Sequence, residues 1–230
     1  MKCWICGKDA DSREHITKAS DVRMFYGKIS SAKPLYLHSA SHKNVKNVPL
    51  HSAKSDKLKT KNKVICRRCN DTDTSIYDNA WSELLRYLHN NWNQIKTKER
   101  INLKKIFPGK SNETAINFHL YFVKLFGCRI IDENIPIDID KFSYSVKNRT
   151  VHDTLYLTFN YWNLTEGAIY LGPSQIETKN YIGSIEMATW LYSIGELDVQ
   201  LVWFNNPPEK NVPKAWSPND KGSIIKFRRK

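Results

Sequence analysis

Two Cys-x-x-Cys pairs constrain this chain more than any other feature: Cys3 with Cys6, and Cys66 with Cys69. At this spacing one turn of backbone presents two sulfurs to the same ion, and two such turns supply the four ligands of a tetrahedral zinc site. Four of the five cysteines fall into the pairs, which favours a metal site over the disulfide framework of a short secreted protein. Cys128 is left over and is expected to be an inert buried thiol.

The two pairs are far apart in the chain, with 59 residues between Cys6 and Cys66. Compact zinc fingers close over roughly 12–20 residues, so the alternative of two unrelated turns stays open. An inserted loop is compatible with a zinc site, because closure entropy grows slowly with loop length. No apolar segment follows Met1, so we expect no signal peptide, no membrane association and a reducing, cytoplasmic location.

A second pattern surrounds the cysteines. Glu14-His15 follows the first pair, and Asn70 directly follows Cys69. In this order the first third of the chain resembles the HNH, or ββα-metal, endonucleases, in the branch whose finger is stapled by a structural zinc. The resemblance implies a treble-clef-like finger that hydrolyses phosphodiester bonds with a metal ion. The products would carry a 5′-phosphate and a 3′-hydroxyl. Proteins of this kind would serve restriction, defence against foreign DNA or mobile elements.

By this resemblance, His15 is the general base, and Glu14 and Asn70 bind a catalytic Mg²⁺ or Mn²⁺ ion separate from the zinc. A neutral imidazole can accept a proton near neutral pH, and an ion with few oxygen ligands keeps positions open for a phosphate. Adjacent residues on a strand point to opposite faces, so a bend is required for Glu14 and His15 to reach one phosphate.

The family's middle asparagine braces the loop that holds the histidine. Asn62, shortly before Cys66, is the preferred candidate in this sequence, and Asn44 and Asn47 are the alternatives.

The positive charge is unevenly distributed. The formal net charge is +13, and the segment from Ile16 to Asn70 carries ten lysines and three arginines against two aspartates, so the rest of the chain nets only +2. A basic segment inside the motif predicts contacts with the phosphate backbone of nucleic acid, although a solvated loop is the alternative. The resemblance to HNH endonucleases implies that this nucleic acid is DNA. The candidate contact residues are Lys54, Lys57, Lys59, Lys61, Lys63, Arg67 and Arg68.

The remaining chain predicts an α+β fold. Apolar residues at helical spacing predict one long helix from Ile76 to Ile95, and the charged residues 96–100 suggest a boundary between a finger domain, 1–100, and an accessory α+β domain, 101–230. Beyond it we expect a strand over 101–107, a buried helix over 115–126 closed by Gly127, and strands over 154–159, 168–171, 188–194 and 199–204.

Three functions compete on this reading. The first is an HNH-type endonuclease that acts on DNA. The second is a zinc module that binds nucleic acid without cleaving it. The third is an adaptor that holds a protein partner through its aromatic C-terminal domain.

Overall fold

The computed structural model of the chain describes residues 1–41, 44–162, 170–206 and 215–230. The fold is α+β, as predicted. The helices are α1 Ala19–Tyr26, α2 Ser75–Asn90, α3 Trp92–Lys98, α4 Leu103–Ile106, α5 Ser111–Asp132, α6 Asp140–Asn148 and α7 Pro218–Lys221. The strands are β1 Leu35–Ser41, β2 Asn44–Leu50, β3 Arg100–Asn102, β4 Leu155–Tyr161, β5 Tyr170–Pro173, β6 Glu177–Tyr181, β7 Ser184–Gly195, β8 Leu197–Phe204 and β9 Ile224–Arg229.

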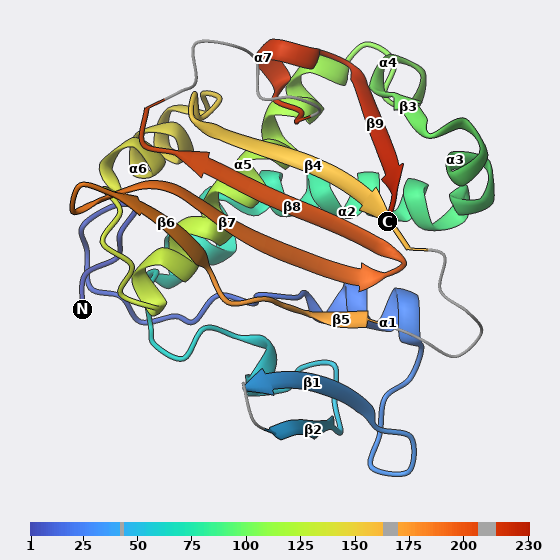
Figure 1. Ribbon diagram of the computed structural model, residues 1–230, viewed down its shortest axis with the longest axis horizontal. Helices are drawn as coiled ribbons and strands as arrows, with labels where there is room; N and C mark the ends of the chain where they lie inside the picture. Colours follow the sequence, from blue (N-terminus) through green and yellow to red (C-terminus); the bar gives the residue numbers. More distant parts are fainter. Residues whose placement is uncertain (42–43, 163–169, 207–214) are drawn as a thin grey trace.

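The main sheet has the strand order β3-β9-β4-β8-β7-β5, and β6 also pairs with β7 (Figure 1). Neighbouring strands are antiparallel except β4 and β9, which run parallel. Strand β7 alternates buried and less buried side chains, with Ala188, Trp190, Tyr192 and Ile194 on the buried face. This period of two identifies the face that packs on the helices. The β1–β2 hairpin lies outside this sheet.

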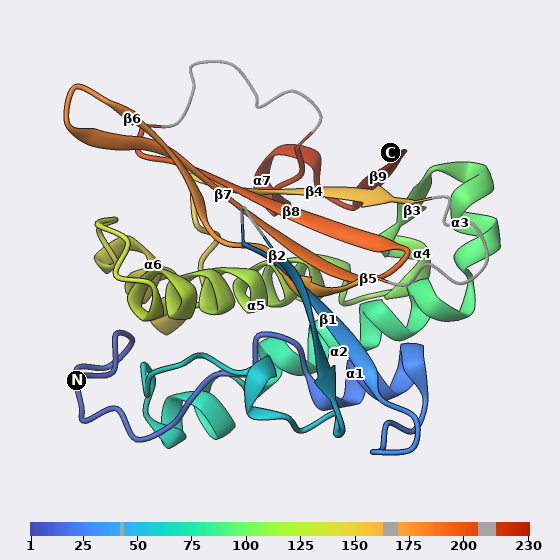
Figure 2. The same ribbon diagram turned by 60° about the horizontal axis from the view of Figure 1, so that its bottom comes forward.

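The molecule is layered. Figure 2 shows the sheet above α5 and α6, with α1, α2 and the N-terminal segment on the other side of α5. Trp81 of α2 stacks on Tyr121 of α5, with ring centroids 5.6 Å apart, and meets Phe122 edge-on at 4.7 Å. Because α5 lies between two layers, it is buried along almost its whole length.

One buried cluster includes residues from Cys3 to Phe227. It therefore continues across residue 100, where the sequence suggests a boundary between 1–100 and 101–230. Strand β3, at that position, is paired with β9 near the other end of the chain. The division into a finger domain, 1–100, and an accessory domain, 101–230, stays a prediction.

Three sequence predictions need correction. The expected long helix is two helices, because α2 ends before Asn91, whose side-chain amide donates to the Tyr87 carbonyl at 2.9 Å. The expected strand over 101–107 is β3 followed by α4, because the Asn102 side chain accepts a hydrogen bond from the Lys104 N–H and caps a helical turn.

The third correction concerns Gly127, which lies inside α5 and does not end it. A Cβ at this position would lie 2.8 Å from ring atoms of Trp4, so the glycine allows the indole to approach the helix backbone. The Trp4 indole N–H also donates to the Cys128 sulfur at 3.3 Å. Burial raises the pKa of the Cys128 thiol, as expected of an inert cysteine.

The predicted strands over 154–159, 188–194 and 199–204 lie within or largely within β4, β7 and β8. Of the strand predicted over 168–171, Tyr170 and Leu171 belong to β5, and residues 168 and 169 lie outside the described residues. None of the described helices is long and apolar enough to cross a membrane.

Candidate metal centre and finger groove

The four paired cysteines come together in space. Their Sγ atoms all lie within 4.8 Å of one another, and those of Cys6 and Cys66 are 3.6 Å apart. Zinc–sulfur bonds of about 2.3 Å in a tetrahedron place sulfurs roughly 3.8 Å apart, so the donor set fits zinc. All five cysteines are free thiols, with no disulfide. The predicted group Cys3, Cys6, Cys66 and Cys69 is therefore confirmed as one that could hold a zinc ion.

Each cysteine pair lies on a tight turn. The Cys3 N–H donates to the Lys8 carbonyl at 2.7 Å, and Gly7, at φ 76°, donates to the Cys3 carbonyl at 2.8 Å. That positive φ suits glycine and lets the chain reverse directly after Cys6. In the second pair, a π-helical turn, η2 Arg68–Asp73, begins between Cys66 and Cys69. The Cys69 N–H points at the Cys66 sulfur at 3.4 Å.

A short ribbon carries the Glu14-His15 pair. Backbone hydrogen bonds join Ser12 to Ile65, Glu14 to Thr60, and Ile16 to Leu58. His15 and Lys59 form a bridge in the same ribbon. Two extended segments therefore precede the helical segment η2 and α2. That order is compatible with a ββα finger, and the HNH assignment itself stays a prediction.

The Glu14 carboxylate points inward and is 3% exposed. Its Oε1 lies 3.2 Å from Nζ of Lys124, an α5 side chain that also donates to Asp78 Oδ2 at 2.9 Å. Lys18 lies 3.5 Å from the other Asp78 oxygen. Glu14 Oε2 is buried without a hydrogen-bond partner. The four side chains form a network of two carboxylates and two ammonium groups inside the protein.

The network perturbs its own titration. Burial raises the pKa of Glu14 to about 7, although the Lys124 charge acts in the opposite direction. Burial also disfavours charged Lys124, but Glu14 and Asp78 outweigh it and raise the pKa of that ammonium.

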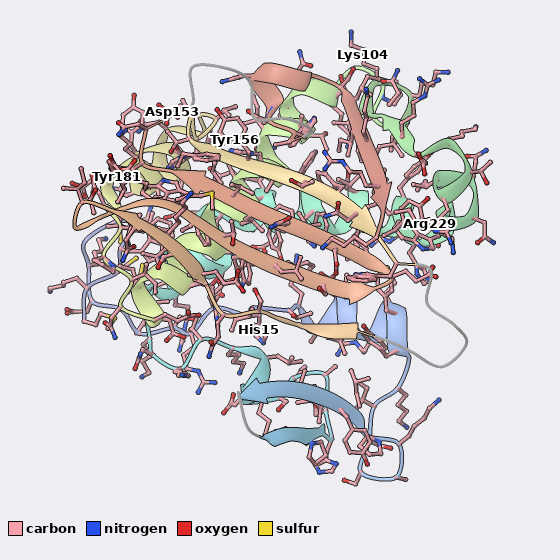
Figure 3. All side chains as sticks on the ribbon, in the orientation of Figure 1. His15, Lys104, Asp153, Tyr156, Tyr181 and Arg229 are labelled. Atoms are coloured by element: carbon pink, nitrogen blue, oxygen red, sulfur yellow. The ribbon has the colours of Figure 1, made fainter. Side chains whose placement is uncertain are left out.

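His15 is half-buried beside this network, and Figure 3 shows it between the main sheet and the β1–β2 hairpin. Burial lowers its pKa, and the charges of Lys59, Lys124 and Arg13 lower it further. The imidazole is therefore neutral at neutral pH, the protonation state that a general base requires.

The other two expected catalytic residues have local partners. Asn70 donates from its side-chain amide to Ser12 Oγ at 3.1 Å. The backbone N–H groups of Lys61 and Asn62 donate to the two Asp132 oxygens at 2.9 and 2.8 Å, which ties this loop to α5. Asn62 thus contacts the end of α5. The alternatives Asn44 and Asn47 lie on β2, outside the residues whose side chains are described.

The described residues therefore place the Glu14 carboxylate against Lys124 and the Asn70 amide against Ser12. Apart from the four cysteines, no group of three or more histidine, cysteine or carboxylate side chains in the described ranges is close enough to hold an ion.

A groove of about 1000 Å³, here called the finger groove, lies between the ribbon and the end of α5. Its cationic lining residues are Arg13, Lys57, Lys59, Lys61 and Arg129, and its carboxylates are Asp56, Asp132 and Glu133. Of the predicted contact residues, Lys57, Lys59 and Lys61 line the groove. The remaining four, Lys54, Lys63, Arg67 and Arg68, are exposed elsewhere on the surface.

The carboxylates in the finger groove are all engaged. Asp56 pairs with Arg13 at 3.2 Å and with Lys59 at 3.0 Å. Asp132 accepts the two backbone N–H groups described above, and Glu133 pairs with Arg129. Five cations against three carboxylates leave the groove with an excess of positive charge.

Three site residues were not identified from the sequence: Lys124, Asp78 and Arg129. Lys124 comes from α5, more than a hundred residues after Glu14, which it contacts. Arg129 comes from the same helix and lines the finger groove with Arg13. One signal was available, since Lys124 lies in the mostly apolar segment 115–126, and a lysine buried in a helix needs a carboxylate partner.

The chain matches no protein-family model, no curated protein and no solved structure. The resemblance to HNH endonucleases therefore depends on the motif residues alone.

Proposed function

We propose that the chain is a zinc-stapled nucleic-acid-binding protein whose finger groove receives the phosphate backbone. The observation that carries the proposal is the convergence of Lys57, Lys59 and Lys61 with Arg13 and Arg129 along one groove. Lysine and arginine contacts to phosphate give affinity without reading the base sequence. The finger groove is therefore suited to a backbone contact and gives no base preference.

Zinc would hold the two ends of the finger in place. Cys3 and Cys6 lie before the ribbon, and Cys66 and Cys69 lie after it, so one ion would close the loop that carries the lysines. Structural zinc contributes folding free energy directly. In this proposal the metal positions the groove and takes no part in chemistry.

A second candidate function is HNH-type phosphodiester hydrolysis, most simply of DNA. The observation in its favour is His15, whose lowered pKa keeps the imidazole neutral at neutral pH. His15 lies in sequence between the groove-lining residues Arg13 and Ile16, and its backbone forms a β-bridge with that of Lys59. By resemblance, a Mg²⁺ or Mn²⁺ ion on Glu14 and Asn70 would neutralise the leaving oxygen. Glu14 would then have to exchange its contact with Lys124 for the ion.

Two measurements on the zinc-loaded protein test these functions separately. The first is the affinity for a fluorescein-labelled DNA duplex, by fluorescence anisotropy over a series of salt concentrations without Mg²⁺. The second is nicking of a supercoiled plasmid with Mg²⁺ or Mn²⁺. RNA and single-stranded DNA are offered in both.

The finger variant replaces the groove-lining Lys57, Lys59 and Lys61, together with the neighbouring Lys63, by Gln. For every phosphate that the variant no longer binds, the slope of log affinity against log salt should become shallower by roughly 0.9. The matched control, called the remote variant, removes the same charge from exposed positions outside the finger: Lys141, Lys147, Arg149 and Lys179. A finger variant that binds with the slope of the remote variant would refute the role of the groove.

Cleavage is tested with His15→Ala. If His15 is the base, this variant binds DNA as the wild type does and cleaves none, because only proton abstraction is removed. Binding by the wild-type protein without cleavage selects the non-catalytic module, and the absence of both leaves the adaptor.

A further inference from the structure

A second basic surface lies at the edge of the main sheet, away from the finger. Residues 92–106 contain five lysines and arginines and one glutamate, and residues 223–230 contain four lysines and arginines and no acidic residue. These segments are separated by more than a hundred residues, and the antiparallel pairing of β3 with β9 brings them together. Their combined charge is +8, although the whole chain outside Ile16–Asn70 nets +2.

The pairing places like charges directly opposite each other. Arg100 of β3 is the register partner of Lys226 of β9, and both side chains are exposed. Like charges across from each other on antiparallel strands reduce stability. Lys98 and Lys105 are exposed on the neighbouring α3 and α4. No ion pair is found for these four side chains, here called the sheet-edge patch, within the described part of the chain.

Three members of the sheet-edge patch surround a hollow. The hollow has a volume of about 400 Å³ between α3, β3 and α4, and its polar rim includes Lys98, Arg100 and Lys105 with Gln94 and Asn102. Its floor contains isoleucine side chains, and none of its lining residues is a carboxylate. The finger groove, in contrast, has three carboxylates in its lining. An anionic group would therefore meet cations in this hollow with no carboxylate in its lining. Glu99, between Lys98 and Arg100 in the sequence, is not a lining residue and accepts a hydrogen bond from the Tyr161 hydroxyl.

We propose that the sheet-edge patch is a second contact surface for nucleic acid, with Lys98, Arg100, Lys105 and Lys226 on its phosphates. This inference rests on the proposed function in one respect, since both require a nucleic-acid ligand. The residues are different, because none of the four belongs to the finger. Figures 1 and 2 both show β3 and α3 at the end of the molecule opposite the N-terminus, near which the zinc ligands Cys3 and Cys6 lie. Figure 3 labels two further cations of the same edge, Lys104 on α4 and Arg229 on β9.

The chemistry of the patch favours nucleic acid over a membrane surface or a protein partner. A membrane-bound surface inserts large apolar side chains beside its cations, and a protein interface is centred on buried aromatic anchors. The large exposed apolar residues of the described chain are Met1, Tyr36, Tyr144, Tyr181 and Ile182, and none of them belongs to this edge. Protein–DNA interfaces are polar and strongly positive, as this edge is.

Protection of an edge strand is the competing explanation, since charged side chains on a short edge strand prevent pairing with other chains. That role would account for Arg100 on β3. It does not require Lys226 on the inner strand β9, nor cations from two helices. The two explanations differ in what they predict for binding.

The test uses the full chain loaded with zinc. The edge variant replaces Lys98, Arg100, Lys105 and Lys226 by Gln and is compared with the wild type, the finger variant and the remote variant in the same anisotropy series. All four edge side chains are exposed, and the change relieves the repulsion between Arg100 and Lys226. The variant should therefore melt no lower than the wild type, and melting temperature and zinc content check its fold.

We expect the edge variant to bind duplex DNA at least tenfold more weakly than the remote variant at a salt concentration of about 0.1 M. Its salt slope should be smaller than that of the remote variant by up to roughly 3–4, at about 0.9 for each phosphate contact. Weaker binding in the edge variant alone would support the inference and refute the finger groove. Weaker binding in the finger variant alone would do the reverse.

Equal slopes for the edge and remote variants would overturn the inference, including the case in which the wild type binds no nucleic acid. Vesicles of phosphatidylserine and phosphatidylcholine, and an acidic protein, are offered in parallel. The inference would also be overturned if the edge variant lost binding to the vesicles or to the acidic protein but bound DNA as the remote variant does.

Discussion

Replacement of Lys124 by Met should destabilise the protein in a way that depends on pH. Lys124 is fully buried and contacts Glu14 Oε1 at 3.2 Å and Asp78 Oδ2 at 2.9 Å. The variant loses a charged hydrogen bond to Asp78, which contributes about 1.5–3 kcal/mol. Asp78 keeps Lys18 as a partner. Glu14 keeps no cation within ion-pair distance among the described residues.

The contribution of Glu14 has an upper limit, because a buried carboxylate that loses its cation can take up a proton. The folded-state pKa of Glu14 is about 7 in the wild type. In the variant it rises further, so at pH 8 the variant must protonate a group that the wild type leaves ionised. That costs at most about 1.4 kcal/mol for each pH unit above 7.

The total at pH 8 is therefore about 3–4 kcal/mol, in the range of about 3–5 kcal/mol for removal of one partner from a buried ion pair. Below pH 6 Glu14 is protonated in both proteins, and only the share of about 1.5–3 kcal/mol from Asp78 remains. The sign follows from proton binding: the folded variant binds one more proton than the folded wild type above pH 7, so its deficit grows with pH.

The assay is urea unfolding followed by tryptophan fluorescence, at pH 6, 7 and 8 with zinc in excess. Lys147→Met, on the exposed face of α6, is the matched control and should change stability by less than about 0.5 kcal/mol. The double variant Lys124→Met, Glu14→Gln is compared with Glu14→Gln alone, and the deficit between these two should not change with pH, because the titrating group is absent from both. A single-variant deficit below about 1 kcal/mol at pH 8, or one that is the same at all three pH values, would refute the reasoning.

The remaining predictions concern the metal, acid stability and Gly127. Wild-type protein should contain one zinc per chain by elemental analysis, and Cys66→Ser should lose it together with much of its thermal stability. His119 and His152 are buried, and burial lowers their pKa values to about 3 and about 4. Unfolded histidine binds protons from about pH 6.5 downward, so each should remove about 1.4 kcal/mol of stability per pH unit between pH 6 and 4, measured by urea unfolding. Gly127→Ala should destabilise by about 1–3 kcal/mol, because the clash with Trp4 outweighs the better helix propensity of alanine.

Each of these predictions has a contrary result. Cys66→Ser that retains full zinc content would exclude this ligand set. Glu14 titrates in the same range with the opposite sign, so the histidines are assessed by the stability difference between the wild type and the variant His119→Asn, His152→Asn. A difference that does not change between pH 6 and 4 would show that the two histidines titrate normally in the folded protein. Gly127→Ala is paired with the same change in a Trp4→Leu background, where alanine should be neutral or stabilising. A destabilisation in that background equal to the one in the wild type would exclude the steric explanation.

The local patterns were readable from the sequence. The cysteine spacing predicts the four-sulfur cluster, because each pair acts within one turn and the ion needs only two such turns. The apolar period of α2 predicts its buried face, including Trp81 and Leu84. These features depend on residues within a few positions of one another.

Two failures were local, since α2 ends before Asn91 and Asn102 caps α4. The others involve distant parts of the chain. A glycine after an apolar helical segment predicts a helix end, but Gly127 makes room for Trp4, more than a hundred residues earlier in the chain. The sequence showed Glu14 beside His15 but not that Lys124 holds it. The charge count outside the basic insert concealed the sheet-edge patch, because acidic residues elsewhere in the chain cancelled cations that β3–β9 pairing gathers. The main sheet likewise includes pairings between strands that are far apart in the sequence, such as β3 with β9.

The position of β9 between β3 and β4 sets an order of events during synthesis. Strand β3 emerges from the ribosome more than a hundred residues before β9, and in the finished sheet β9 is its pairing partner. Until β9 arrives, the nascent chain exposes both the lone β3 and the open edge of β4. An unpaired strand edge is a site where newly made chains associate wrongly. This edge of the sheet can therefore close only after Ile224–Arg229 has left the ribosome.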